Sequence, residues 1–203
     1  MTTLHNNGNT ALIGVDTAKQ PLGQAINFRK PLFDAMEKLA TRIVNALDAT
    51  EDVTDALIKD ARTILRKIRG ARKEKINPNP TPEDPQQISA SQQSFDNQLA
   101  HYNELIALVA AEPLYNPNET DIQNAALATF ATDLQNANQA VITAATPYLT
   151  ALTKRNKFLY EAKTGIVDVA LEAKKYVKSV STITLAEFRQ ISGLKFTRPK
   201  KTT

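Results

Sequence analysis

Apolar side chains recur at alternating steps of three and four residues along most of this 203-residue chain. The first two series are Leu32, Met36, Leu39, Ile43 and Ala46, and Leu57, Ala61, Ile64 and Ile68; further series cover 95–109, 127–148 and 166–180. Alternating steps of three and four place the side chains of one series on one face of an α-helix. Because helices with such a face must bury it against other elements, the pattern predicts an all-α fold.

The mean period of 3.5 residues predicts heptad-like packing of helices that lie side by side at a shallow angle. We therefore expect an antiparallel bundle of five to six helices. A first helical hairpin is predicted over 25–72, and a second hairpin with the C-terminal helices over 89–193. The string "NPNPTPEDPQQ" separates them, with four prolines in eleven residues. Proline removes backbone donors, so a loop is predicted over 76–88.

The ends of the predicted domain follow from weaker patterns. Residues 1–20 have little periodicity and include "HNNGNT", which indicates a loose N-terminal arm. The single bundle domain is expected over 21–196, with the first helix starting near Ala25 or Pro31. Residues 197–203 are predicted to be a basic tail.

One proline interrupts the longest apolar series. If the segment from 120 to 160 is helical, Pro147 cannot donate a hydrogen bond to the carbonyl of Thr143, and its ring crowds that carbonyl. We expect the long helix to be kinked or broken near Pro147.

Charge is distributed unevenly along the chain. Residues 59–75 contain eight Lys or Arg and two acidic residues, while 76–153 contain no Lys or Arg and eight acidic residues. Residues 154–203 contain twelve basic and four acidic residues. Because of this distribution, we predict that the residues of the two basic clusters bind anions or partners. They are Arg66, Lys67, Arg69, Arg72, Lys73, Lys75, Lys154, Arg155 and Lys157.

Several interpretations of these clusters remain open. Cations in the last turn of a helix stabilise the negative end of its dipole, which is a sufficient structural reason for those at 66–69. Alternatively, the two clusters share one end of the bundle and bind a protein partner. In a variant of this hypothesis, a basic cluster contacts the acidic 76–153 segment of another copy. Nucleic acid is the alternative partner, through its phosphates, although no recognition motif is present.

Enzyme chemistry is not expected from this composition. The chain has no Cys, and its two histidines are His5 and His101. His101 lies three residues before Glu104, the reverse of the repeated Glu-x-x-His pairs that di-metal bundles use. No glycine-rich phosphate-binding loop occurs. We therefore predict a non-enzymatic protein without cofactors.

Membrane insertion is not expected either. The longest apolar run, "LIALVAA", has seven residues and cannot span a bilayer. The first residues lack the basic and apolar regions of a signal peptide. A cytoplasmic location is the expectation.

Five strings carry a resemblance to known sequences: "RKIRGARK", "ISASQQSFD", "EPLYNPNE", "RNKFLYEAKTGIVDVALEAKKYVKSV" and "QISGLKF". Together they resemble a set of all-helical proteins of Bacteroidota-type bacteria that has no assigned function. The resemblance covers roughly residues 30–196. It implies a bacterial, all-helical protein and no particular chemistry.

Overall fold

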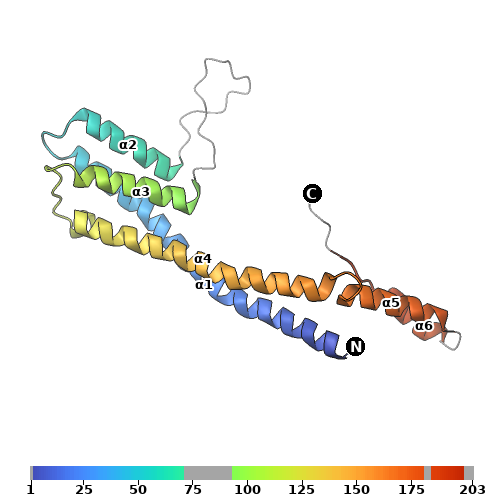
Figure 1. Ribbon diagram of the computed structural model, residues 1–203. Helices are drawn as coiled ribbons and strands as arrows, with labels where there is room; N and C mark the ends of the chain where they lie inside the picture. The colour runs from blue at the N-terminus through green and yellow to red at the C-terminus, as the bar shows by residue number, and fades with distance from the viewer. Residues whose placement is uncertain (1, 71–92, 181–183, 199–203) are drawn as a thin grey trace, which may run out of the picture. The chain divides into compact units, whose positions relative to one another are not determined.

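The computed structural model describes residues 2–70, 93–180 and 184–198 (Figure 1). Within these ranges all regular structure is helical, so the predicted all-α class is confirmed. The elements are α1 (Thr2–Asp48), α2 (Asp55–Arg69), α3 (Phe95–Ala110), the short 3-10 helix η2 (Thr120–Ile122), α4 (Asn124–Tyr160), α5 (Ile166–Ser179) and α6 (Leu185–Gly193).

The chain divides into two compact units. Unit 1 comprises residues 1–23 and 143–203, and unit 2 comprises residues 24–142. The cluster of buried apolar side chains that forms the main core belongs entirely to unit 2. The main core thus lies within residues 24–142, and the single bundle domain over 21–196 stays a prediction.

The core of unit 2 takes side chains from α1, α2, α3, η2 and α4. Met36 and Ile43 of α1 are fully buried, as their place in the apolar series predicts. Leu32 and Leu39 are only partly buried and pack at the edge of the core. The remaining fully or nearly fully buried members are Phe33, Ala40, Val44, Leu47, Ala61, Ile64, Leu65, Ile68, Tyr102, Leu105, Val109, Tyr115, Ile122, Leu127 and Leu134.

Helix α1 begins at Thr2, so residues 2–20 are helical and do not form the predicted loose arm. The helix also continues through Pro31, where a helix start was predicted. Residues 2–20 have a packed helix face that the sequence did not reveal. Gly8, Ala11 and Val15 are buried on it at helical spacing, and the first two are too small to form a recognisable apolar series. A Cβ atom on Gly8 would lie 2.4 Å from Cδ1 of Ile166, so a larger residue at position 8 would require the end of the Ile166 side chain to shift.

Helix α2 has a well-defined cap at each end. The hydroxyl of Thr54 accepts a hydrogen bond from the Leu57 N–H at 3.4 Å, which makes Thr54 the N-cap. The hydroxyl of Thr50, which lies between α1 and α2, donates to the carbonyl of Ala46 and does not cap α2. Gly70 ends the helix with a φ of 61°, in the left-handed region that glycine adopts without steric cost.

The connection from α2 to α3 contains residues 71–92, so the predicted proline-rich loop at 76–88 lies outside the described residues. Helix α3 is capped by Ser94, whose hydroxyl accepts from the Asn97 N–H at 3.2 Å. Residue 89, where the second hairpin was predicted to begin, falls in the same undescribed segment.

Helix α4 continues through Pro147 as one element from Asn124 to Tyr160. The alternative in which the helix breaks at this residue is therefore wrong. The kink stays a prediction.

A partly buried polar network links α1, α3 and α4 in unit 2. The Arg29 guanidinium lies 3.8 Å from the centre of the Phe95 ring and donates to Oδ1 of Asn138 at 3.4 Å. Asn138, which is buried, donates through Nδ2 to Oδ1 of Asp96 at 2.9 Å. Burial lowers the pKa of Arg29, and the charge of Asp96 opposes that shift. The network thus joins the three helices through specific side-chain contacts.

We expect Asp96→Ala to lower the free energy of unfolding by about 1–2 kcal/mol, because it leaves the buried Asn138 amide without its acceptor. Chemical denaturation followed by circular dichroism measures the change. Asp133→Ala removes an exposed carboxylate from α4 and should change stability by less than about 0.5 kcal/mol. Asp96→Asn keeps an acceptor oxygen, so its loss in the free energy of unfolding should lie between those of the two alanine variants. Equal losses in Asp96→Ala and Asp133→Ala would contradict this role.

In unit 1, polar contacts join α5 to the segment after α6. Nζ of Lys174 donates to the carbonyl oxygens of Ser192 and Leu194, both at 2.8 Å, and so satisfies acceptors at the end of α6. Arg198 forms an ion pair with Asp168. The Lys163 N–H and, to a lesser degree, Arg198 lower the pKa of Asp168. Arg198, which was assigned to the basic tail, therefore has a partner; residues 199–203 lie outside the described part.

Candidate functional site

The described cations of the first basic cluster sit in the last turn of α2, as predicted. Each has a polar contact. Arg66 donates to the hydroxyl of Thr63 at 2.7 Å, Lys67 forms a 3.5 Å ion pair with Glu104 of α3, and Arg69 donates to the hydroxyl of Thr41 of α1. The Lys67 and Arg69 contacts join the end of α2 to α3 and α1, whereas the Arg66 contact lies within α2. Arg72, Lys73 and Lys75 lie outside the described residues.

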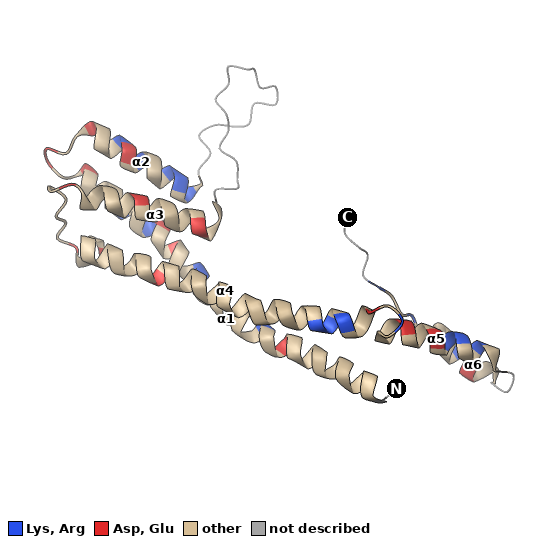
Figure 2. Cartoon of the chain, viewed as in Figure 1, with Lys and Arg blue, Asp and Glu red and all other residues tan. Residues whose placement is uncertain are grey.

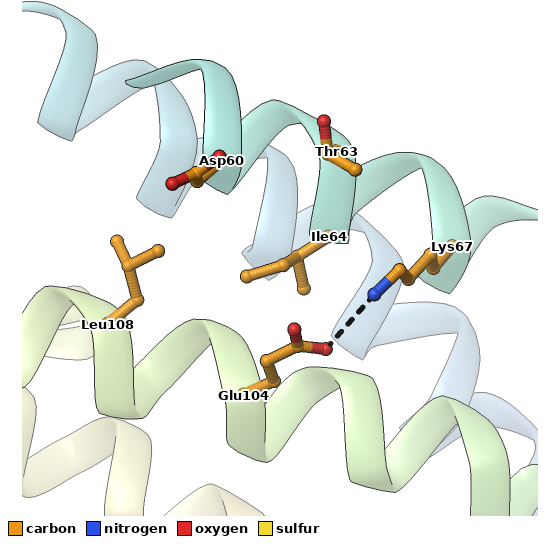
Figure 3. Close-up of a pocket in the computed structure, with 6 residues that line it drawn as sticks. All are labelled: Asp60, Thr63, Ile64, Lys67, Glu104 and Leu108. Atoms are coloured by element: carbon orange, nitrogen blue, oxygen red, sulfur yellow. Dashed lines mark ion pairs between the residues drawn. The ribbon is translucent and has the colours of Figure 1, made fainter. Parts of the chain in front are cut away.

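A groove lies between α2 and α3 (Figure 3). We call it the α2–α3 groove, and it encloses a volume of about 440 Å³. Its lining residues are Asp60, Thr63, Ile64, Lys67, Glu104 and Leu108. The two apolar side chains, one from each helix, give the groove an apolar lining beside the charged groups.

The charges of the groove are arranged unequally. Glu104 contacts both Lys67 and His101 through the same oxygen, Oε2, at 3.5 Å and 3.4 Å. Asp60 is exposed and has no polar partner among the residues that the structure describes. The groove therefore carries two carboxylates and one lysine, and one of the carboxylates is open to a donor from outside.

The groove was missed in the sequence although a local signal exists. Asp60 precedes Ile64 by four residues, and Glu104 precedes Leu108 by four. Each pair places an acid and an apolar residue next to each other on one helix face. Only the alignment of α2 against α3 shows that the two pairs line a common groove.

A second surface lies on α4 in unit 1. We call it the α4 basic patch; its residues are Leu149, Thr150, Thr153, Lys154 and Lys157, and they line an open hollow of about 450 Å³. Leu149 is 59% exposed. The two threonine hydroxyls donate to helix carbonyls at 2.9 Å and 3.0 Å.

The lysines of the patch differ from the cations of α2. Lys154 and Lys157 are exposed, and neither has a polar partner within the described ranges. Arg155 lies outside the patch and is half-buried, and its guanidinium donates to Oδ1 of Asn156 at 3.1 Å and 2.8 Å. Two of the three residues predicted for this cluster are thus available to a partner. The shared end of the two clusters stays a prediction, since they belong to different units.

The two units have opposite net charge. Figure 2 marks the Lys, Arg, Asp and Glu residues of the described chain. Unit 1 contains 13 Lys or Arg and 5 Asp or Glu, which gives a formal charge of +8. Unit 2 contains 12 basic and 16 acidic residues, which gives −4. The modest charge of +4 for the whole chain hides this separation.

In the ranges 2–70, 93–180 and 184–198, no group of three or more His, Cys, Asp or Glu side chains is placed to hold a metal ion. None of the described helices combines the length and apolar character that crossing a membrane requires.

Comparison with protein-family models, with curated proteins and with solved structures found no match to this chain.

Proposed function

We propose that the protein is a non-enzymatic structural or interaction protein whose molecules associate through surfaces of opposite charge. The observation that carries the proposal is the separation of charge, +8 on unit 1 and −4 on unit 2. Such a separation favours encounters in which unit 1 of one molecule approaches unit 2 of another. We also propose that the chain belongs to the set of all-helical bacterial proteins that its five strings resemble.

Unit 2 would act as an antiparallel four-helix bundle that holds the acidic surfaces in place. Contacts between α3 and α4 support this arrangement. Tyr102 packs edge-on against Phe130 with ring centroids 6.0 Å apart, and Asp96 accepts from Asn138. Residue numbers fall along α3 as they rise along α4, which is the order expected for antiparallel neighbours.

Exposed apolar side chains support an interaction role for unit 1. A large apolar side chain left in water forgoes about 1.5–3 kcal/mol of burial free energy, and groups of them mark binding surfaces. Among the described residues of this unit, seven large apolar side chains are exposed: Leu12, Ile13, Leu149, Leu171, Tyr176, Leu185 and Leu194.

Light scattering at low and high salt tests the proposal. At about 0.01 M salt we expect a mass above the 22.3 kDa of one chain, and at about 0.5 M salt a return toward that value, because salt screens exposed charges. A mass of 22.3 kDa under both conditions would rule out self-association.

Nucleic acid remains the second candidate partner, favoured by the charge of +8 on unit 1 and by the unpartnered Lys154 and Lys157. Phosphate binding of this kind weakens steeply with salt and needs no base contacts. A gel-shift series with mixed DNA and RNA separates the two candidates. If no shift occurs at low salt while the protein still self-associates, nucleic acid is excluded as the partner and a protein partner remains.

A further inference from the structure

We infer that the α4 basic patch of one molecule binds the α2–α3 groove of a second copy. This inference rests on the proposed function and names the two surfaces that would perform it. Both surfaces combine apolar and charged side chains, and their net charges are opposite: two lysines lie in the patch, and two carboxylates with one lysine lie in the groove.

The chemistry of the two surfaces is complementary. The patch offers the exposed side chain of Leu149 and the ammonium groups of Lys154 and Lys157. The groove offers apolar contact mainly through Leu108, since Ile64 is buried in the core, and it carries two carboxylates and one lysine, Lys67. A helix that lies in a groove between two others buries its apolar residues at the centre and pairs its charges at the rim.

Open acceptors in the groove match the open donors of the patch. Asp60 has no partner in the described part of the chain, so it can accept from an incoming lysine without breaking an existing ion pair. Both contacts of Glu104 go to Oε2, which leaves Oε1 for a second lysine. No Lys or Arg occurs between residues 76 and 153, so α3 contributes no cation that would repel the patch.

The two surfaces also have similar lengths. Leu149 and Lys157 are eight residues apart on α4, which corresponds to about 12 Å at about 1.5 Å per residue. Asp60 and Lys67, which mark the ends of the groove on α2, are seven residues apart, or about 10 Å. One patch can therefore cover one groove.

The contact joins two different surfaces and is thus head-to-tail. Each molecule uses its patch for one neighbour and its groove for another. Contacts of this type close into rings or continue into filaments, depending on the rotation between neighbours.

Charge reversal in the full-length chain tests the contact. The patch variant carries Lys154→Glu and Lys157→Glu, and the groove variant carries Asp60→Lys and Glu104→Lys. We expect each variant alone to associate at least about tenfold more weakly than the unmodified protein at low salt, because like charges then face each other. An equimolar mixture of the two should recover association, because each contact again pairs opposite charges.

A matched control separates this contact from the general effect of net charge. Lys178→Glu with Arg189→Glu changes the charge of unit 1 by the same amount, at exposed positions of α5 and α6. This control should keep most of the association. The helical circular dichroism of every variant verifies folding, and Asp60→Lys alone tests the groove with the Lys67–Glu104 pair intact.

The outcomes distinguish this inference from the proposed function. Salt-dependent association that weakens equally in the control and in both variants, or a mixture that fails to recover it, would overturn the patch–groove contact while self-association stands. An unmodified protein that is monomeric at every salt concentration would overturn both.

Discussion

Tyr102→Ala should lower the free energy of unfolding by about 3–5 kcal/mol, and Tyr102→Phe should leave it unchanged or raise it by up to about 1 kcal/mol. Tyr102 is fully buried in α3, and its ring packs edge-on against Phe130 at an interplanar angle of 82°. Alanine would remove the ring and leave a cavity that the neighbouring helices only partly fill.

The hydroxyl group explains the opposite expectation for phenylalanine. The Tyr102 hydroxyl is buried, and no hydrogen-bond partner is present for it among the described residues. Burial raises the pKa of Tyr102, as expected for a phenol whose charged form is kept from water. Folding removes this hydroxyl from water without a compensating hydrogen bond, so its deletion should cost nothing.

Tyr115→Phe is the matched control for the Tyr102 pair. The Tyr115 hydroxyl donates to the carbonyl oxygen of Ile122 at 3.0 Å, so its loss should cost about 1 kcal/mol. Urea denaturation of the three variants, fitted with a common dependence on denaturant, gives the comparison. A loss above about 1 kcal/mol in Tyr102→Phe would mean that the Tyr102 hydroxyl has a stabilising partner.

The helical class could be predicted because apolar spacing is a local property of the chain. Met36, Ile43, Ala61, Ile64 and Ile68 are buried at the positions that the series assign. The exact face was less well defined. Phe33, Ala40 and Leu47 of α1 are buried more deeply than the predicted Leu32, Leu39 and Ala46, because a helix with several neighbours buries a wider face than a coiled-coil seam.

Small residues account for the error at the N-terminus. Gly8 and Ala11 contribute little to an apolar series, so the packed face of residues 2–20 resembles a polar loop in the sequence. The close approach of Ile166 to Gly8 gives these residues their packing role. Such an approach depends on a residue more than 150 positions away, which no local pattern reports.

The candidate surfaces could be predicted only in part, for a similar reason. Lys154 and Lys157 follow from the block charges, and they are exposed as expected. The charge pattern alone could not separate them from Lys67 and Arg69, whose partners Glu104 and Thr41 lie on other helices. The sequence therefore locates the basic clusters, but only the tertiary structure shows which of their side chains are available to a partner.

Pro147→Ala should raise the stability of α4, by up to about 3 kcal/mol in local free energy of unfolding. Pro147 lies inside the helix and is exposed, so the substitution removes little packing. Alanine supplies an N–H that can donate to the carbonyl oxygen of Thr143 and removes the ring that crowds this carbonyl.

Hydrogen exchange measures the effect best, since local opening of residues 143–160 need not coincide with global unfolding. Slower exchange of these amides is the expected result. Thr150→Ala, at another exposed position of α4, controls for the helix propensity of alanine and should add only about 0.5 kcal/mol or less. If the amides of residues 143–160 exchange no more slowly in Pro147→Ala than in this control, Pro147 does not destabilise α4. The kink predicted from the missing donor would then lose its physical basis.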